Sequence, residues 1–348
     1  MRLFAKLNFK RLGFYLGLIA GPLLIYILFR NTDFSLLADK LSGLRLTFVL
    51  IIAITTVSQL CAVIAWYLAF PEKMKVKSLY SLFKIRLIGE SFAQINPLNL
   101  IGGETFKALL LKRWLKVGLA KGAMSILTSR ILLVLSMFLL AVIGGTMLFM
   151  RFDLAGIRVY AYVFLGMVII LYSYSFYTLG KGHGLFFFAA GLLAPLASKT
   201  AIAAKAVSLF KEIDRDMVIL YKKRKSAFFS AFFLSIMHMV IGATEYYVIF
   251  KALDVDVGFF TCIVFDLSST AVRSMGFLVP GQLGFEELTN RIMFSLVNLN
   301  DDYLWQTVSI IRRGRQFFWI ITGFIFYAVA SRSGMVPASD KANYENKQ

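Results

Sequence analysis

The chain has 348 residues, of which 59% are hydrophobic and 16% are charged, and its mean hydropathy is +0.73. A soluble domain of this length carries far more charge, so the composition excludes a soluble protein and indicates a membrane protein with several spans. Lysine and arginine outnumber aspartate and glutamate by 38 to 19, which gives a net charge of +19. Such an excess is typical of the cytoplasmic loops of membrane proteins, and no aromatic-basic groove motif supports nucleic-acid binding.

The first half of the chain predicts four spans and one segment that turns back inside the membrane. The spans lie at about 12–29, 46–70, 123–150 and 157–179, and the re-entrant hairpin lies at 78–115. Basic residues precede the first span, which places the N-terminus in the cytoplasm. Basic residues also stand at both ends of the hairpin segment, so we expect both of its ends to face the cytoplasm.

A basic segment at 185–225 separates the two halves. Its apolar part, 185–198, is too short to cross a bilayer comfortably, and the stretch at 199–225 is densely basic. We predict a cytoplasmic segment that lies partly on the membrane surface, with a membrane-crossing hairpin as the alternative.

The second half predicts a span at about 226–250, a second re-entrant hairpin at 257–299, a sixth span at about 303–331 and a polar cytoplasmic tail at 332–348. The flanks of the second hairpin are acidic or neutral, so it enters from outside and the first hairpin from inside. The predicted fold is therefore an all-α polytopic membrane protein with about six transmembrane helices and two re-entrant broken-helix hairpins. Their opposite directions predict an inverted repeat within a single domain, 1–331.

The two hairpins share a polar pattern. The first contains GESFAQINPLNLIGGETFKALL at 89–110, and the second contains AVRSMGFLVPGQLGFEELTNRI at 271–292. Broken helices are tolerated at membrane depth only where protein or a wet cavity covers them, and a matched pair points to a transport site between repeats. Aligning the prolines pairs Ser91 with Ser274, Glu104 with Glu287, and Glu90 with Arg273. The predicted hinge residues are Pro97, Gly102, Gly103, Pro280, Gly281 and Gly284.

Ionisable residues at membrane depth are costly unless they are paired or face a wet cavity. In the first hairpin, Arg86 and Glu90 are four residues apart, and Glu104 and Lys107 are three apart. Each pair can therefore meet on one face of a helix. Simple ion pairs near the membrane surface are the alternative to a substrate site.

In the second hairpin, Glu287 and Arg291 can pair in the same way, whereas Arg273 has no nearby partner along its helix. The sixth span contains IIRRGRQFFW, and its three arginines within four positions cannot all face lipid. We therefore expect an anion site formed by Arg273 and the arginines of this span.

Helices that start after Gly103 and Gly284 would favour an anionic group such as phosphate, unless the adjacent glutamates cap them. Arg130 and Glu245 are further interior candidates. The predicted substrate-binding residues are Glu90, Asn96, Glu104, Lys107, Arg273, Glu287, Arg312 and Arg313.

No sequence motif predicts catalysis. The chain contains no nucleophile elbow, zinc-protease motif or phosphate-binding loop. Its two cysteines, Cys61 and Cys262, have neither disulfide nor metal-ligand spacing. We therefore expect no enzyme activity, no cofactor and no bound metal.

The motif at 89–110 resembles the first signature of the lysylphosphatidylglycerol synthase transmembrane-region family of flippase-like proteins. The segment at 271–292, with the later arginines, is similar to the C-terminal signature of that family. The GES, GGE, AVRS and VPG motifs together are most similar to its hopanoid-associated branch. NPLNL around Pro97 and the additional acid at Glu286 depart from the pattern, which leaves the substrate open.

The resemblance implies a bacterial or archaeal membrane protein that moves, or helps to move, a lipid between leaflets. Together with the charge pattern, which places both termini in the cytoplasm, it predicts a multi-pass protein of the bacterial cytoplasmic (inner) membrane. The substrate would be a phospholipid, a polyprenyl phosphate or a hopanoid-type lipid, and enzymes of lipid biosynthesis are candidate partners. We expect the aminoacyl-transferase domain of synthase members to be absent, because the chain ends soon after the sixth span. Two alternatives stay open: a membrane-embedded transferase acting on a polyprenyl phosphate or other lipid, and a non-catalytic accessory protein of lipid biosynthesis.

Overall fold

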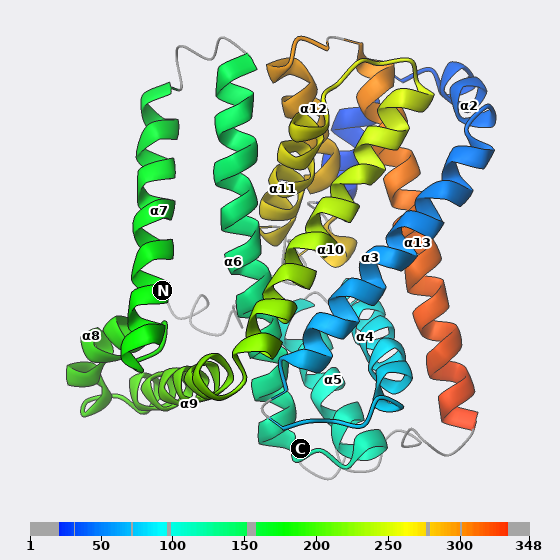
Figure 1. Cartoon of the computed structure of the whole chain (residues 1–348). Helices are drawn as coiled ribbons and strands as arrows, with labels where there is room; N and C mark the ends of the chain where they lie inside the picture. The colour runs from blue at the N-terminus through cyan, green and yellow to red at the C-terminus, as the bar shows by residue number, and fades with distance from the viewer. Residues whose placement is uncertain are drawn as a thin grey trace, which may run out of the picture.

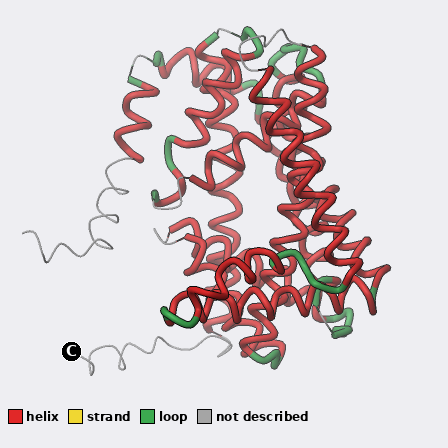
Figure 2. The backbone as a smooth tube through the Cα atoms, turned by 90° about the vertical axis from the view of Figure 1, so that its left-hand side faces the viewer, coloured by secondary structure: helices red, strands yellow, loops and turns green. Residues whose placement is uncertain are grey.

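The computed structural model of the chain describes residues 21–30, 32–70, 72–95, 99–151, 158–275, 279–299 and 301–332. These residues are helical without any strand, as Figure 2 shows, so the all-α prediction is confirmed for them. After a helix at 21–29, the elements are α2 (Phe34–Ser42), α3 (Arg45–Leu68), α4 (Ser78–Ile95), α5 (Asn99–Leu115), α6 (Leu119–Arg151), α7 (Arg158–Lys181), α8 (Phe187–Ala197), α9 (Ala201–Lys223), α10 (Lys225–Ala252), α11 (Phe259–Met275), the 3₁₀ turn η3 (Pro280–Gln282), α12 (Phe285–Leu296) and α13 (Asp302–Arg332).

Four helices of the first half recur in the second half at one constant spacing along the chain, the spacing that separates Pro97 from Pro280. We call it the repeat spacing. Moving α3, α4, α5 and α6 forward by the repeat spacing gives 228–251, 261–278, 282–298 and 302–334. In the described residues, each of these ranges overlaps one α-helix over most of its length, in the order α10, α11, α12 and α13. The similarity of the two motifs therefore extends over four helices in each half.

The contacts between the two halves follow the same repeat. Helix α3 packs against its counterpart α10, α6 packs on α11, and α13 packs on α4. The last helix of each half therefore covers a helix of the other half. In Figure 1, α4 and α5 lie at the lower end of the bundle, whereas α11 and α12 lie at the upper end. We call α4–α5 the first helix pair and α11–α12 the second helix pair.

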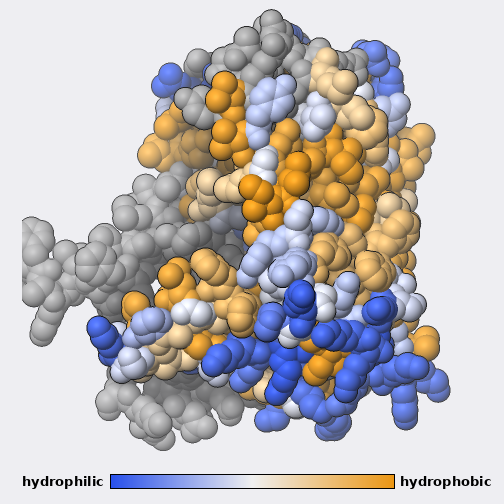
Figure 3. Space-filling model, turned by 60° about the vertical axis from the view of Figure 1, so that its left-hand side comes forward, coloured by the Kyte–Doolittle hydropathy of each residue, from blue (hydrophilic) through white to orange (hydrophobic). Residues whose placement is uncertain are grey.

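In the described part of the chain, four helices are long and apolar enough to cross a membrane. They are Arg45–Leu68, Leu119–Met147, Tyr162–Lys181 and Lys225–Ala252. Helix α13 has 31 residues, a length of about 46 Å, which suffices for a hydrocarbon core of about 30 Å, but three arginines interrupt its apolar sequence. The first predicted span is only partly described, so the count of six spans stays a prediction. Hydrophobic residues cover the middle and upper part of the face in Figure 3, and hydrophilic residues gather at its lower end.

Helices α7, α8 and α9 lie outside the repeat. Figure 1 shows α7 standing beside α6, with α8 and α9 lying across the lower end of the bundle. Helix α8 is apolar but has only 11 residues, too few to span a bilayer. Helix α9 packs Met217 and Leu220 into a core that includes Leu179 and Phe228. The segment predicted at 185–225 thus consists of a short apolar helix and an amphipathic one.

Helix α5 runs without interruption through Gly102 and Gly103, which differs from the hinge expected there. The second glycine instead permits close packing between α4 and α5. A Cβ on Gly103 would lie 2.6 Å from the Cβ of Ala93 and 2.6 Å from the backbone oxygen of Gly89. No larger residue fits at this crossing without a shift of one helix, because real Cβ atoms do not approach other atoms so closely.

The connection between α11 and α12 has the unusual backbone that its glycines predict. Gly281 has a φ of 62° and Gly284 a φ of 85°, values that residues with a Cβ rarely adopt. Gly284 directly precedes α12, and a Cβ there would lie 2.6 Å from Cδ2 of Leu24. Gly284 therefore meets both a conformational and a steric requirement, whereas Gly103 meets only a steric one.

Candidate functional site

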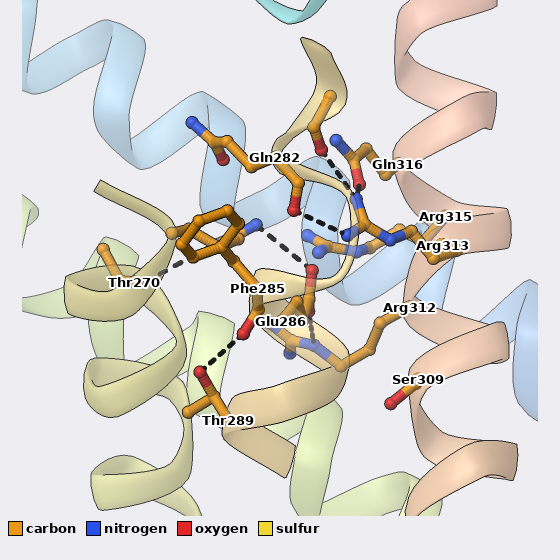
Figure 4. Close-up of polar contacts among 12 residues, drawn as sticks. Thr270, Gln282, Phe285, Glu286, Thr289, Ser309, Arg312, Arg313, Arg315 and Gln316 are labelled. Carbon is orange, nitrogen blue, oxygen red and sulfur yellow. Dashed lines mark hydrogen bonds and ion pairs between the residues drawn. The ribbon is translucent and has the colours of Figure 1, made fainter. Parts of the chain in front are cut away.

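Arg312 lies at the centre of a buried group of charges in the second half. Figure 4 shows it beside Glu286. Its Nε donates to Oε1 of Glu286 at 2.5 Å, its Nη1 to Oε2 of Glu245 at 2.8 Å, and its Nη2 to Oδ1 of Asp266 at 3.1 Å. The guanidinium also lies over the ring of Tyr246, 4.0 Å from the centroid. Only 1% of the Arg312 side chain is exposed, so α10, α11 and α12 together enclose a cation presented by α13.

The next residue, Arg313, binds the turn that precedes α12. Its Nε and Nη2 donate to the two carboxylate oxygens of Glu287, at 2.6 and 2.9 Å. Its Nη1 and Nη2 donate to the backbone oxygens of Gly281 and Gln282, at 2.9 and 3.1 Å. Oε2 of Glu287 also accepts the backbone N–H of Gly284 at 3.0 Å. Arg313 and Glu287 together hold the glycine turn against α13; Figure 4 shows Arg313 beside Gln282 of this turn.

Two further arginines complete this group. Nε of Arg315 lies 2.9 Å from Oε1 of Glu245, and Nη1 of Arg273 lies 3.6 Å from Oε2 of Glu286. Counted over the described residues, the group contains four cations and four anions, so its charges balance and each offsets the desolvation cost of another. We call it the C-terminal charge cluster; its members are Arg273, Arg312, Arg313, Arg315, Glu245, Asp266, Glu286 and Glu287.

A second group, the N-terminal charge cluster, comprises Arg86, Glu90, Glu104, Lys107 and Arg130. Nη2 of Arg86 lies 3.0 Å from Oε1 of Glu90. Nζ of Lys107 lies 3.4 Å from Oε1 of Glu104 and 3.8 Å from Oε1 of Glu90. Nη2 and Nε of Arg130 donate to Oε1 of Glu104 at 2.5 and 2.9 Å. The two pairs predicted within the first hairpin are therefore confirmed, and Arg130 joins them from α6.

The two clusters contain one salt bridge in the same register. Glu104 and Arg130 are 26 residues apart, and so are Glu287 and Arg313. Each member of the later salt bridge follows its counterpart by the repeat spacing. Both salt bridges join the second helix of a helix pair to the last helix of the same half, α5 to α6 and α12 to α13. The repeat therefore extends from helix order to individual ionic contacts.

Each of these salt bridges borders a hollow. Glu104 and Arg130, with Lys107, line a cavity of about 20 Å³, which has room for about one water molecule. Glu287 and Arg313 line an open groove of about 490 Å³. Apart from Ser309, the other residues of this groove are apolar or aromatic: Pro22, Ile25, Tyr26, Phe29, Leu283, Ile310 and Phe317.

Seven of the eight predicted substrate-binding residues lie in the two clusters. The N-terminal cluster contains Glu90, Glu104 and Lys107, and the C-terminal cluster contains Arg273, Glu287, Arg312 and Arg313. The eighth, Asn96, and the predicted hinge Pro97 lie outside the described residues. The predicted pairing of Glu287 with Arg291 is wrong, because Glu287 binds Arg313 and Arg291 is exposed on α12.

The clusters also contain residues outside the predicted substrate-binding set, of which Arg130 and Glu245 are predicted only as interior residues. These residues are Arg86, Arg130, Glu245, Asp266, Glu286 and Arg315. Arg130 had a usable signal, because it precedes Arg313 by the repeat spacing. Gln59 had none, although its Oε1 accepts a hydrogen bond from Nε of Arg86 at 2.9 Å. Gln59 lies in the apolar helix α3, and only the packing of α3 against α4 brings it to Arg86.

Comparison with known proteins finds one family whose sequences match nearly the whole chain. The sequence profile of the lysylphosphatidylglycerol synthase transmembrane region matches residues 14–334, which include both helix pairs and both charge clusters. The chain belongs to this family. Membership in the lysylphosphatidylglycerol synthase transmembrane-region family makes it a multi-pass membrane protein and is consistent with a lipid-related membrane function. No curated protein and no solved structure matches the chain.

Proposed function

We propose that this protein moves a lipid with a polar or anionic headgroup between the two leaflets of the bacterial cytoplasmic membrane, as a flippase or scramblase. The observation that carries the proposal is the salt bridge between Arg313 and Glu287 beside an open apolar groove of about 490 Å³. A lipid requires both surfaces, because its chains need apolar contact and its headgroup needs a few placed polar groups. The groove offers them side by side.

The proposed membrane arrangement has six spanning helices, both termini in the cytoplasm and two re-entrant helix pairs that enter from opposite sides. The recurrence of helices at the repeat spacing supports it, as do the positions of the two helix pairs at opposite ends of the bundle (Figure 1). Charged residues within a membrane domain are costly and mark substrate paths in many transporters. Broken helices at equivalent positions of two repeats have the same association.

The salt bridge between Arg313 and Glu287 closes the proposed lipid path in this structure. Arg313 is engaged by the carboxylate of Glu287 and by two backbone carbonyls. An anionic headgroup that replaced Glu287 at Arg313 would release the carboxylate and the turn that it holds. Arginine suits this exchange, because its planar fork binds carboxylate and phosphate with the same geometry.

Reconstitution of the full-length protein in liposomes tests the proposal. Phospholipids labelled on the headgroup would be followed with a membrane-impermeant quencher, with and without an ion gradient, against protein-free liposomes. We expect quenching beyond the outer-leaflet fraction. Arg313→Gln is expected to slow this transfer at least about tenfold, the equivalent of one lost charge-assisted hydrogen bond.

Arg291→Gln is the matched control, since Arg291 is an exposed cation on α12 and lies outside both clusters. Its transfer rate should stay within about twofold of the wild-type rate, because exposed charges contribute little. If no tested lipid crosses faster than in protein-free liposomes under either condition, the proposed function is wrong. Equal slowing by both substitutions would exclude the Arg313 site.

A further inference from the structure

The two charge clusters differ in their net charge. Among the described residues, the N-terminal charge cluster has three cations, Arg86, Lys107 and Arg130, and only two anions, Glu90 and Glu104. The C-terminal charge cluster has equal numbers of both. An uncompensated charge in a poorly solvated site is costly, and an anionic ligand removes that cost. The excess positive charge therefore favours binding of an anion in the first half without the breaking of an ion pair, which the Arg313 site of the second half requires.

The pairing inside the N-terminal charge cluster is also incomplete. The side chain of Lys107 is only 5% exposed, yet its nearest carboxylate oxygens lie 3.4 and 3.8 Å away. Charge-assisted N–H···O contacts are ordinarily about 2.7–2.9 Å long. Among the described residues, the ionic contacts of Glu104 all use its Oε1, whereas its buried Oε2 has no hydrogen-bond partner. Lys107 is thus a buried ammonium whose charge its two carboxylate neighbours, at 3.4 and 3.8 Å, compensate only in part.

Arg130 makes this cluster accessible. Its side chain is 44% exposed, compared with 1% for Arg312. Its Nε and Nη2 bind Glu104, which leaves the N–H groups of Nη1 for a further acceptor. The adjoining cavity of about 20 Å³ is too small for a phosphate. A ligand therefore reaches the cluster along the accessible side of Arg130 and does not simply fill the cavity.

We infer that the N-terminal charge cluster binds the phosphate of an anionic lipid headgroup, with Arg130 as the first contact. One negative charge from the phosphate balances the excess positive charge of the cluster. Lys107 and Arg86, the other two cations, attract the phosphate electrostatically without contacting it. The inference rests on the proposed function and adds to it the class of headgroup, a phosphate ester. It also assigns a phosphate site to the first half in addition to the Arg313 groove of the second half, because the first-half cluster alone has excess positive charge.

Binding to the purified full-length protein in an uncharged detergent tests the inference. Isothermal titration calorimetry would compare dioctanoyl phosphatidic acid, dioctanoylglycerol and inorganic phosphate. We expect the phosphatidic acid to bind, and the uncharged dioctanoylglycerol to bind at least about tenfold more weakly, because it lacks the phosphate. Arg130→Gln should weaken the binding of phosphatidic acid by a similar factor. Inorganic phosphate should bind more weakly than the lipid, since it lacks the chains.

Lys121→Gln is the matched control for unspecific attraction of an anionic lipid. Lys121 lies on α6, like Arg130, but its side chain is 62% exposed and pairs with Glu72 outside the cluster. Its substitution should change the affinity by no more than about twofold. Thermal unfolding of each variant verifies its fold, and Arg130→Lys, which keeps the charge, should retain part of the affinity if the glutamine variant fails to fold.

Glu104→Gln gives the sharpest outcome. The substitution removes an anion that repels the phosphate, so we expect phosphatidic acid to bind more tightly than to the wild type. A purely structural role for Glu104 predicts weaker binding, and that result would contradict the inference. Unchanged affinity of Arg130→Gln, or equal affinity for dioctanoylglycerol, would also overturn it. Equal affinity for inorganic phosphate would overturn the assignment to a lipid.

The liposome assay separates this inference from the proposed function. If Arg130→Gln loses binding while no lipid moves in liposomes, the phosphate site stands and lipid transfer is wrong. If lipids move but their binding does not depend on Arg130, lipid transfer stands and the site assignment is wrong.

Discussion

Replacing Arg312 by methionine is expected to destabilise the fold more than any change to an exposed charge. The substitution keeps an unbranched side chain but leaves Glu245, Asp266 and Glu286 without the cation that they share. Removing one partner of a buried ion pair costs about 3–5 kcal/mol in soluble proteins. Three hydrogen bonds between membrane helices, at about 0.6 kcal/mol each, give a lower limit of about 2 kcal/mol. We therefore expect Arg312→Met to lower the free energy of unfolding by about 2–5 kcal/mol.

The measurement is unfolding of the purified protein in mixed micelles, with the helical circular-dichroism signal followed as the denaturing detergent is increased. Arg291→Met is the control, because it removes an exposed cation and should cost less than about 0.5 kcal/mol. The double variant Arg312→Met/Asp266→Asn also removes a carboxylate whose ion pair in the described residues is with Arg312, so it should be more stable than Arg312→Met alone. A loss of less than about 1 kcal/mol for Arg312→Met, or a further loss in the double variant, would refute the account of a shared buried cation.

Three further predictions concern the backbone and the membrane arrangement. Gly103→Ala should lower the midpoint of thermal unfolding and the free energy of unfolding by about 1–3 kcal/mol, because the added methyl group overlaps α4. Gly145→Ala is the control: its Cβ position is in open space, so the substitution should be neutral or stabilising. Gly284→Ala should cost at least about 1–2 kcal/mol in the same assay, since its left-handed backbone disfavours a Cβ; an unchanged midpoint would contradict the strain argument. In a background without native cysteines, Glu72→Cys should resist a membrane-impermeant maleimide applied to intact cells and Asp256→Cys should react, and labelling of both from outside would contradict the proposed topology.

The sequence was sufficient for those features of the fold and site that depend on local spacing. The pairs Arg86–Glu90 and Glu104–Lys107 follow from helical periodicity, and both are present. The glycines that precede α12 follow from the same kind of reasoning, because their positive φ values are a local property of the turn. The long helix at the position of the sixth predicted span is likewise present as α13.

Features that depend on contacts between distant elements could not be read from local spacing. Glu287 and Arg291 have suitable spacing for a salt bridge, but Arg313 offers Glu287 a bidentate contact from α13, and the tertiary contact prevails. Gly103 resembles a helix breaker in the sequence, and only the proximity of α4 explains why a glycine stands inside a helix. Arg130 is an intermediate case. Its partnership with Glu104 is a contact between distant elements, but the repeat spacing, extended beyond the two motifs, matches Arg130 to Arg313 and Glu104 to Glu287.

Helix α13 joins the C-terminal charge cluster to α4, the helix that carries Arg86 and Glu90. Its arginines enter the C-terminal cluster, and one turn later Nε2 of Gln316 donates to Oε1 of Gln94 on α4, at 2.9 Å. Further along, the ring of Tyr327 packs against Phe92 of α4, with centroids 5.0 Å apart. A rotation or translation of α13 would therefore change contacts in both halves. Rearrangement of the ionic contacts of Arg312 and Arg313 is thus coupled to the packing of α13 against α4.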